Sequence, residues 1–306
     1  MLSDAEVSAR ARALWAAIEP FAGHVYFSPE ANAEYTALGF GTGRGSLPSG
    51  VQTSNRDAYN TSRGSALGHA SGEVVAAAFA VFEPEMVAAA VERGWALADP
   101  DTIAAARRRG ATNSLRRMIG EKPDGLGRVI ELLNRASEPL QMAGRPLFAG
   151  LCARDLPADP LGRAWALADR LREYRGDSHT AAWIAAGFDA VEIGLLSEQW
   201  WDLPPRTYVY TRAWTDTQLD AATRRLQERG MLDGERLSPA GRLAREQIEL
   251  ATDYQMRPAV EALNGDIDEL LGAVGRWSAA IQAAGGYPDL YGAQLAARVA
   301  AQRQQP

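Results

Sequence analysis

Hydrophobic residues recur at helical spacing along most of the chain. The pattern i, i+3, i+4, i+7 places apolar side chains on one helix face, and near the N-terminus it is followed by Ala11, Leu14, Trp15 and Ile18. Proline behind a capping or acidic residue marks a helix start, because its missing N–H costs nothing in the first turn. Such starts occur at Ser28-Pro29, Glu83-Pro84, Asp99-Pro100 and Asp159-Pro160. The chain is therefore predicted to be mainly α-helical.

Two segments interrupt this pattern. From Gly39 to Gly64 the chain is rich in Gly, Ser, Thr and Asn, which is typical of a loop. Within it, Gly41-Thr42-Gly43-Arg44-Gly45 lacks the preceding strand and following helix of a phosphate-binding loop, so a plain flexible loop is predicted. A softer stretch from Glu121 to Gly127 is predicted to separate two domains, residues 1–125 and residues 126–306.

The clearest architecture lies in the second half of the chain, where three helices are predicted in succession. Asp177 is placed to cap a helix that begins near Ser178. A second helix is expected from Phe188 to Trp201. A third opens at the capping box Thr215-Asp216-Thr217-Gln218 and runs through Arg229.

A hairpin and a closing helix are predicted after these three helices. Gly230 is a C-terminal cap, and Asp233-Gly234 between two leucines is a strong tight-turn signal. Ser238-Pro239 starts the last helix. Three helices, a hairpin and a closing helix make up a winged helix-turn-helix. The predicted fold is mainly α, with two winged-helix-turn-helix-like halves and short β-hairpin wings.

Two sets of motifs resemble known families. The segment Arg225-Leu226-Gln227-Glu228-Arg229-Gly230-Met231-Leu232, followed by Leu237-Ser238-Pro239-Ala240-Gly241, resembles the helix and wing of multiple-antibiotic-resistance-type regulators. Over roughly residues 10 to 275 the chain resembles a poorly characterised actinobacterial family of tandem winged-helix proteins. The motifs that carry this second resemblance are Tyr26-Phe27-Ser28-Pro29-Glu30, Gly144-Arg145-Pro146-Leu147, Leu171 to His179, Arg212-Ala213-Trp214, and Glu249 with Thr252-Asp253. The resemblance implies a fold and no particular activity.

The densest polar cluster contains Arg172, Glu173, Arg175, Asp177 and His179. At a predicted corner before a helix, the helix dipole favours anions and a neutral imidazole. One hypothesis is catalytic, with His179 as a general base that Asp177 orients. A second is an anion pocket lined by Arg172 and Arg175. The third is structural, an N-cap with ion pairs that join two helices.

Further side chains are candidates for the same ligand pocket. Glu249 and Asp253 lie four residues apart and share a helix face, where they form either an acid–base pair or a solvated acidic surface. Tyr26 and Trp183 are candidates for an aromatic wall, although large aromatic residues also serve as core. Glu30, from the same motif as Tyr26, completes the predicted ligand-binding set.

Composition narrows the classes of protein. The chain has 306 residues, of which 46% are hydrophobic and 23% charged, as in an ordinary globular protein. One cysteine excludes an intramolecular disulfide, and the longest apolar run, Val74 to Phe82, is too short to cross a membrane. A cytoplasmic protein without a membrane partner is therefore predicted. No metal is predicted because the three histidines, His24, His69 and His179, lie in separate segments.

These observations lead to two functional hypotheses. The favoured one is a cytosolic small-molecule-binding winged-helix protein, or an enzyme of secondary or small-molecule metabolism, with an Arg/Asp/His pocket. The alternative is a ligand-responsive DNA-binding transcriptional regulator that uses residues 215–229 and the Asp233-Gly234 wing. DNA is not favoured, because the net charge is −6 and residues 215–229 balance acidic against basic side chains. The strongest basic patch is Arg107-Arg108-Arg109 with Arg116-Arg117. Neither the cofactor nor the oligomeric state follows from the sequence.

Overall fold

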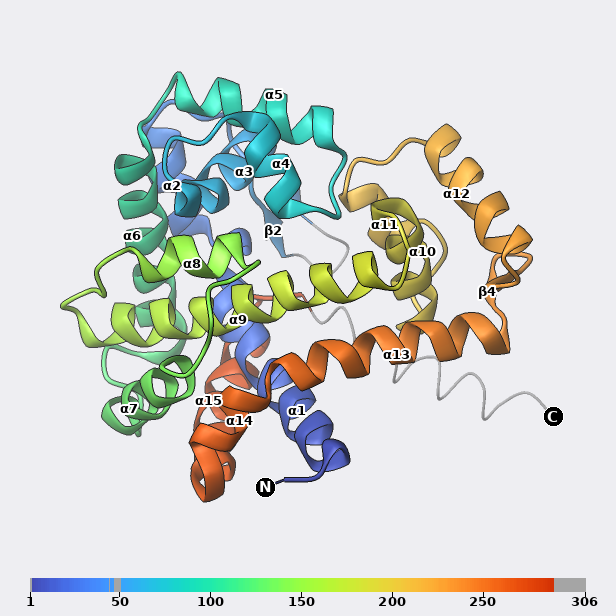
Figure 1. Ribbon diagram of the computed structural model, residues 1–306. Coiled ribbons are helices and arrows are strands. Elements are labelled where there is room, and N and C mark those ends of the chain that lie inside the picture. Colours follow the sequence, from blue (N-terminus) through green and yellow to red (C-terminus); the bar gives the residue numbers. More distant parts are fainter. Residues whose placement is uncertain (1, 44, 47–50, 289–306) are drawn as a thin grey trace.

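Helices dominate the computed structural model, which describes residues 2–43, 45–46 and 51–288 (Figure 1). The prediction of a mainly α protein is confirmed. All four proline-marked starts begin helices, and in each the side chain before the proline caps the first turn. These helices are α2 (Pro29–Ala37), α5 (Pro84–Trp95), α6 (Pro100–Ile119) and α9 (Pro160–Ala185).

The largest hydrophobic core joins both ends of the chain. It contains apolar residues from Ala11 to Tyr174 and from Met256 to Tyr287. Besides α2, α6 and α9, its helices are α1 (Asp4–Gly23), α7 (Leu126–Ser137), α8 (Pro146–Cys152), α14 (Arg257–Leu263) and α15 (Ile267–Ala283), with 3₁₀ turns at His24–Phe27 and Asn264–Asp266. The long helix α9 packs against α1, α6 and α7. The predicted division between residues 1–125 and 126–306 falls inside this core, so it does not coincide with a boundary between cores.

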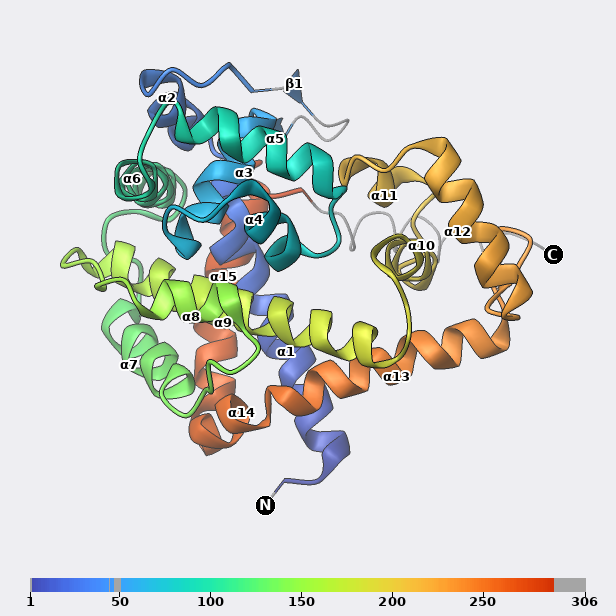
Figure 2. The same ribbon diagram turned by 45° about the horizontal axis from the view of Figure 1, so that its top comes forward.

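A second core is formed by the end of α9 and the elements that follow it. These are α10 (Ala190–Trp200), α11 (Thr207–Thr211), α12 (Asp216–Glu228), β3 (Leu232–Asp233), β4 (Arg236–Leu237) and α13 (Pro239–Gln255). The capping box at Thr215, the positive-φ Gly230 after α12 and the antiparallel hairpin occur as predicted. In Figures 1 and 2 this unit lies at the end of the molecule opposite α6.

A third, smaller core lies among α3 (Arg56–Gly64), α4 (Gly72–Phe79) and α5, next to the 3₁₀ turn Ser65–Leu67. The strand pair β1 (Gly45–Ser46) and β2 (Gln52–Thr53) comes before these helices, whereas β3 and β4 come after α12. The two halves of the chain therefore differ in the order of their elements.

The third core is joined to the second by two hydrogen bonds between turns. The N–H of Glu83 donates to the carbonyl oxygen of Arg212 at 2.9 Å. The indole N–H of Trp214 donates to the carbonyl oxygen of Val81 at 3.0 Å. These bonds fix the turn before α5 against the turn before α12.

The predicted helix start at Asp177 is wrong. Helix α9 runs without a break from Pro160 to Ala185, so Asp177 lies in its interior and no corner exists there. The signal that misled was Gly176-Asp177, which is typical of a helix boundary. Burial of side chains around this point, including Tyr174 and Ser178, outweighs the modest cost of a glycine inside a helix.

The predicted loop from Gly39 to Gly64 is only partly a loop. Its last third is α3, whose first turn is capped by the Asn55 side chain, which accepts from the N–H groups of Asp57 and Ala58. The polar composition hid this helix because its buried face consists largely of small polar residues such as Thr61. Arg44, within the predicted Gly41–Gly45 loop, lies outside the described residues.

Candidate functional site

The clustered polar residues of α9 point in different directions. Successive residues of an α-helix are rotated by about 100° about its axis, because 3.6 residues make one turn. The side chains between Arg172 and His179 therefore reach different neighbouring helices. Arg172 and Glu173 form a first group, Arg175 and His179 face α13 as a second, and Asp177 alone faces α8.

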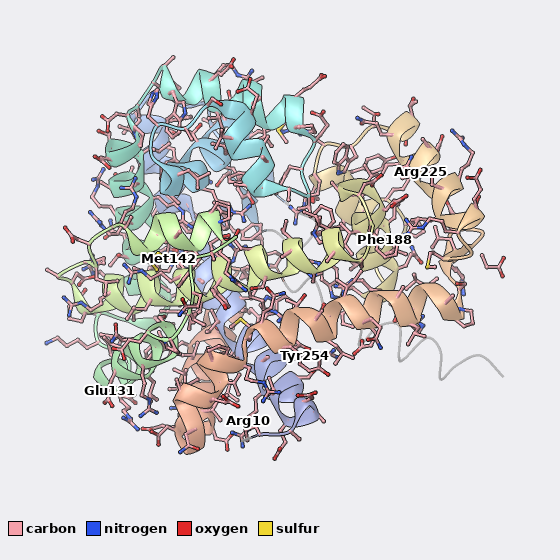
Figure 3. All side chains as sticks on the ribbon, viewed as in Figure 1. Arg10, Glu131, Met142, Phe188, Arg225 and Tyr254 are labelled. Carbon is pink, nitrogen blue, oxygen red and sulfur yellow. The ribbon has the colours of Figure 1, made fainter. Side chains whose placement is uncertain are left out.

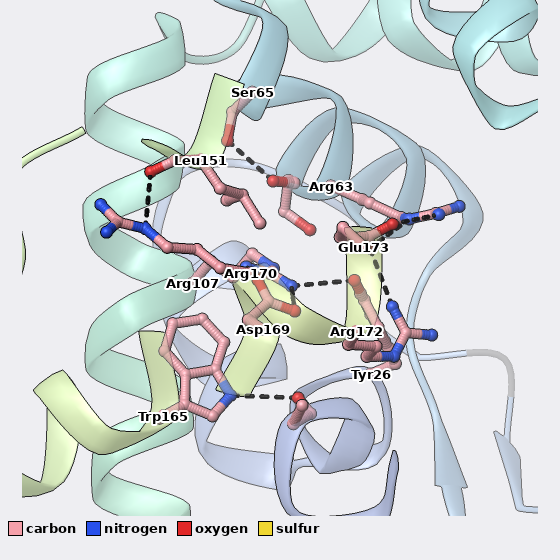
Figure 4. A network of polar contacts seen from close by, with 12 residues as sticks. Tyr26, Arg63, Ser65, Arg107, Leu151, Trp165, Asp169, Arg170, Arg172 and Glu173 are labelled. Atoms are coloured by element: carbon pink, nitrogen blue, oxygen red, sulfur yellow. Dashed lines mark hydrogen bonds and ion pairs between the residues drawn. The ribbon is translucent and has the colours of Figure 1, made fainter. Parts of the chain in front are cut away.

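The first group faces α1 and α3 (Figure 4). Arg172 donates from Nε to Glu19 at 3.0 Å and from Nη1 to Glu173 at 2.8 Å. Glu173 also accepts two hydrogen bonds from Arg63, at 2.9 and 2.7 Å. Burial opposes the ionisation of Glu173, but the charges of Arg63 and Arg172 outweigh it and lower its pKa to about 2. Each guanidinium here is matched by a carboxylate.

Tyr26 lies beside this first group and is buried with it. Its hydroxyl accepts a hydrogen bond from Arg107 Nη2 at 2.8 Å, and Arg107 forms a double hydrogen bond with Asp169. The guanidinium carbons of Arg107 and Arg172 each lie 5.3 Å from the centre of the Tyr26 ring. Tyr26 is thus packed between two arginines in the protein interior.

The second group lies between α9 and α13. Glu249 accepts hydrogen bonds from Arg175 and, at 2.7 Å, from Arg245, which is 1% exposed. Arg175 Nη1 lies 2.9 Å from Asp253 Oδ1, an ion pair without hydrogen-bond alignment. Burial opposes ionisation of Glu249, but Arg245 and Arg175 lower its pKa. The interpretation of Glu249 and Asp253 as a solvated acidic surface is therefore wrong, since both are buried.

Further partners complete the neutralisation of Asp253. Its Oδ2 accepts from Ser8 Oγ at 2.7 Å and from Arg12 Nε at 2.7 Å, both on α1. Asp253 therefore ties α13 to α1 as well as to α9. This arrangement is typical of an internal clamp rather than of a pocket open to ligands.

His179 is held in one tautomer. Its Nδ1 lies 3.2 Å from Thr252 Oγ1, and that hydroxyl donates to the Ile248 carbonyl oxygen at 2.8 Å. Since the hydroxyl proton is already used, Nδ1 of His179 carries the proton and donates it. Burial, followed by the charge of Arg245, lowers the pKa of His179 to about 3. The imidazole is therefore neutral, as predicted, but for a different reason than a helix N-terminus.

Asp177 does not orient His179. It lies two positions away, on a different side of α9, and its carboxylate accepts from the backbone N–H of Phe148 at 3.0 Å. Asp177 thus caps the first turn of α8 instead of its own helix. Burial raises its pKa to about 7. Neither the cavity lined by Arg107 and Arg170 nor the one lined by Glu198 and Arg206 includes Asp177 or His179.

The two remaining predicted ligand-binding residues lie elsewhere. Trp183 is buried in the second core, where its indole N–H has no hydrogen-bond partner among the described residues. Glu30 lies in the first turn of α2 and pairs with Arg117 at 2.5 Å. The structure therefore does not bring all the predicted site residues together around one cavity.

The basic patch on α6 is largely neutralised. Arg107 pairs with Asp169, Arg109 with Glu34, and Arg116 with Glu121 and Asp159, while Arg117 pairs with Glu30. Arg108 is exposed and has no ion pair among the described residues. Because α6 and α12 lie at opposite ends of the molecule (Figure 2), they do not form one basic face.

A cavity of about 60 Å³ lies between α6, the end of α8 and α9. The residues that line it include Arg108 on α6, Arg170 on α9 and Arg154, which follows the end of α8. Sequence reasoning missed Arg154 and Arg170, since they belong to no motif. The one available signal was at Arg108, which has no acidic residue three or four positions away.

Helix α12 and the hairpin after it expose a second polar surface. Leu219, Ala222 and Leu226 bury one face of α12 in the second core. Arg225, labelled on the same helix in Figure 3, pairs with Asp189 at 2.5 Å and with Glu192 at 3.1 Å. Arg229 also pairs with Glu192. These two arginines thus hold α12 against α10.

Three other arginines of this surface are free of such pairs. They are exposed and have no ion pair among the described residues: Arg224 on α12, Arg236 on β4 and Arg242 on α13. Arg206, just before α11, pairs with Asp216 at 2.9 Å and with Asp220 at 2.5 Å. It thereby neutralises two of the carboxylates that made the sequence of α12 look unsuited to DNA.

No group of three or more His, Cys, Asp and Glu side chains in the described ranges is arranged to hold a metal ion. No single described helix has the length and hydropathy to cross a membrane. The successive helices α9 and α10 meet that test only together, and they are bent by 109° relative to each other.

The comparison with known families identifies the family of the chain. The model of a helix-turn-helix family matches residues 11–288, which is most of the chain, and the chain belongs to this family. No curated protein and no solved structure matches the chain. Membership in a helix-turn-helix family favours the hypothesis of a DNA-binding regulator over that of a small-molecule-binding protein or enzyme.

Proposed function

We propose that this protein is a DNA-binding regulator that inserts α12 into the major groove and places the β3–β4 hairpin as a wing beside it. Membership in a helix-turn-helix family over residues 11–288 is the observation that carries the proposal. The order α10, α11, α12, hairpin and α13 is that of a winged helix. In such folds the last helix before the wing reads base edges. A regulator of this kind acts in the cytoplasm, in keeping with the location predicted from the sequence.

The geometry of α12 supports this role. Its buried residues leave Thr217, Asp220 and Arg224 on the opposite, solvent-facing side. Gln227 donates from Nε2 to the Gly234 carbonyl oxygen at 2.9 Å, which fixes the wing relative to the helix. The guanidinium of Arg224 suits bidentate recognition of guanine, the commonest specific contact in the major groove.

The charge of this surface sets the expected mode of binding. Arg224, Arg236 and Arg242 are available for phosphates or bases, but the exposed Glu228, Asp233 and Glu235 lie among them. Each neutralised phosphate contributes about −0.9 to the slope of log affinity against log salt. With Arg224 on a base, Arg236 and Arg242 on phosphates give a slope of about −1.8. We therefore expect weak nonspecific binding, and selectivity that comes from base contacts.

The arginines of α9 have a structural role in this proposal. Arg172 and Arg175 are matched by carboxylates from α1, α9 and α13. They hold α9 in place, and α9 in turn supports the second core, in which α12 packs. The proposal assigns no catalysis to His179 or Asp177.

The test is selection of binding sites from a random duplex DNA library with the full-length protein, followed by fluorescence anisotropy. We expect one enriched sequence, and Arg224→Gln should weaken binding to it at least about tenfold. Arg276→Gln is the matched control, since Arg276 is also exposed and has no ion pair among the described residues, but lies on α15. It should bind like the wild type. Failure to enrich any sequence, with no binding at low salt, contradicts the proposal.

A further inference from the structure

The cavity between α6, α8 and α9 is unusual in its charge. Five arginines line it, Arg63, Arg107, Arg108, Arg154 and Arg170, against two aspartates, Asp155 and Asp169. Its volume of about 60 Å³ is far below the roughly 300–1,000 Å³ of pockets for drug-sized ligands. At about 15 Å³ for each water, it has room for roughly four waters. Its occupant must therefore be small.

Three of the five arginines have carboxylate partners. Arg63 pairs with Glu173, Arg107 with Asp169, and Arg154 with Asp101. Asp101 is almost fully exposed, so that last pair is screened by water. In Figure 4, Arg107 and Asp169 lie together beside the aromatic ring of Trp165, which closes one side of the network.

The remaining two arginines have no carboxylate partner. Arg170 donates from Nε to the Leu151 carbonyl oxygen at 3.3 Å (Figure 4). It also donates from Nη2 to the Arg154 carbonyl oxygen at 2.8 Å. These neutral acceptors orient its guanidinium without removing its charge. Arg108 has no ion pair in the part of the chain that the structure describes. Two aspartates line the cavity, and Asp169 is already paired with Arg107. Among the described residues, Asp155 is therefore the one lining carboxylate left to balance Arg108 and Arg170, and the cavity keeps an excess of positive charge.

One buried donor at the cavity also lacks a partner. The side chain of Arg107 is 7% exposed, and its Nε has no hydrogen-bond partner among the described residues. Buried donors are nearly always satisfied in folded proteins, by protein, water or ligand. This Nε, however, has almost no accessible surface, so it does not reach the cavity, and the excess of arginine charge is what indicates an anion there.

We propose that this cavity binds a small tetrahedral oxyanion, inorganic phosphate or the phosphate group of a small metabolite, with Arg108 and Arg170 as its main ligands. Guanidinium groups are well suited to phosphate oxygens, which accept two parallel N–H bonds. Donors that come from α6, from α9 and from the segment after α8 suit a tetrahedral anion better than a planar carboxylate. The inference does not depend on DNA binding, because the cavity and α12 lie in different cores.

The experiment titrates phosphate into the full-length protein by thermal shift and calorimetry, with sodium chloride at matched ionic strength as the reference. We expect saturable binding to the wild type, and an apparent affinity weakened at least about tenfold in Arg108→Gln, since a charge-assisted hydrogen bond is lost. Arg170→Lys keeps the charge but loses the planar fork, and should also weaken binding. Arg276→Gln removes a comparable exposed charge far from the cavity and should bind like the wild type.

Three results would overturn the inference. One is a phosphate effect no larger than that of chloride. Another is equal binding by Arg108→Gln and Arg276→Gln. The third is binding of acetate as tight as that of phosphate, since a planar carboxylate would then be the preferred anion. Glucose 6-phosphate, compared with phosphate and with glucose, distinguishes a free ion from a phosphate carried by a metabolite.

Discussion

Two groups of arginines beside α9 differ in what neutralises them. Toward α13, Arg175 and Arg245 share Glu249 in the protein interior. Toward α6, Arg108 and Arg170 have no carboxylate partner among the described residues. Arg175 belongs to the densest polar cluster of the sequence and serves as a clamp with Arg245. Arg108 belongs to the basic patch of α6 and Arg170 to no motif, and both border a cavity. The partner supplied by a distant helix, rather than local density of charge, decides whether an arginine can act on a ligand.

The clamp, formed by Arg175, Arg245, Glu249 and Asp253, consists of buried charges that depend on one another. Charges removed from water cost several kcal/mol each, and a close partner offsets that cost only while both members are present. Arg245, Glu249, Arg175 and Asp253 are all nine-tenths or more buried, so they are in this regime. Arg108 and Arg170 at the cavity remain partly in water and carry a much smaller desolvation penalty. The two groups should therefore respond very differently to substitution.

Glu249→Gln should have the largest effect. It leaves Arg175 and Arg245 with a neutral acceptor in place of their shared carboxylate. Breaking a buried ion pair by removal of one partner typically costs about 3–5 kcal/mol of unfolding free energy. Chemical denaturation at pH 7 measures this loss.

The control for Glu249→Gln is Glu131→Gln. Glu131 forms an exposed pair with Arg128 on the surface of α7 (Figure 3). Exposed pairs contribute little, so the control should denature almost like the wild type. Equal, small losses in the two variants would show that the clamp does not stabilise the fold.

Asp177→Asn should change how stability depends on pH. Burial raises the pKa of Asp177 from 3.8 to about 7, so the folded state keeps a proton that the unfolded chain releases. The resulting stabilisation is complete below about pH 4 and is lost as pH rises through 7. Since asparagine does not titrate, the stability of the wild type relative to the variant should fall by at most about 4 kcal/mol between pH 4 and pH 8. Denaturation curves across this range test it, and parallel pH profiles would contradict it.

The fold could be predicted best where the signal is local. The cap before Pro160, the capping box at Thr215 and the cap at Gly230 depend on a few neighbouring residues, and each is found in the structure. The prediction ended a helix at Gly176, whereas α9 continues through it. The packing of distant helices against α9 stabilises this turn, and the local sequence does not reveal that packing. The boundary at residue 125 was predicted from a soft stretch of chain, but the two ends of the chain share one core.

The candidate sites depend on partners that the sequence does not identify. The chain from Arg172 to His179 was correctly singled out as rich in charge, but its neutralisation by Glu19, Glu249 and Asp253 comes from helices up to 153 residues away in sequence. Arg170 draws attention only once its neighbours Leu151 and Arg154 are seen to offer carbonyl groups. Whether an arginine meets a carboxylate or a neutral carbonyl group is decided by the fold, not by the neighbouring sequence.

Arg108→Gln should have the smallest effect on stability, and it sharpens the comparison with Glu249. Without phosphate, removal of an exposed arginine that has no ion pair should change the unfolding free energy by no more than about 0.5 kcal/mol. The sign should favour the variant, because Arg108 shares its cavity with four other arginines and its loss relieves their repulsion. With saturating phosphate the order should reverse, because the wild type binds the anion more tightly and binding to the folded state stabilises it. Denaturation with and without phosphate measures both differences. A loss of more than about 1 kcal/mol without phosphate would mean that Arg108, like Arg175, has a structural partner, and the contrast between the clamp and the cavity would disappear.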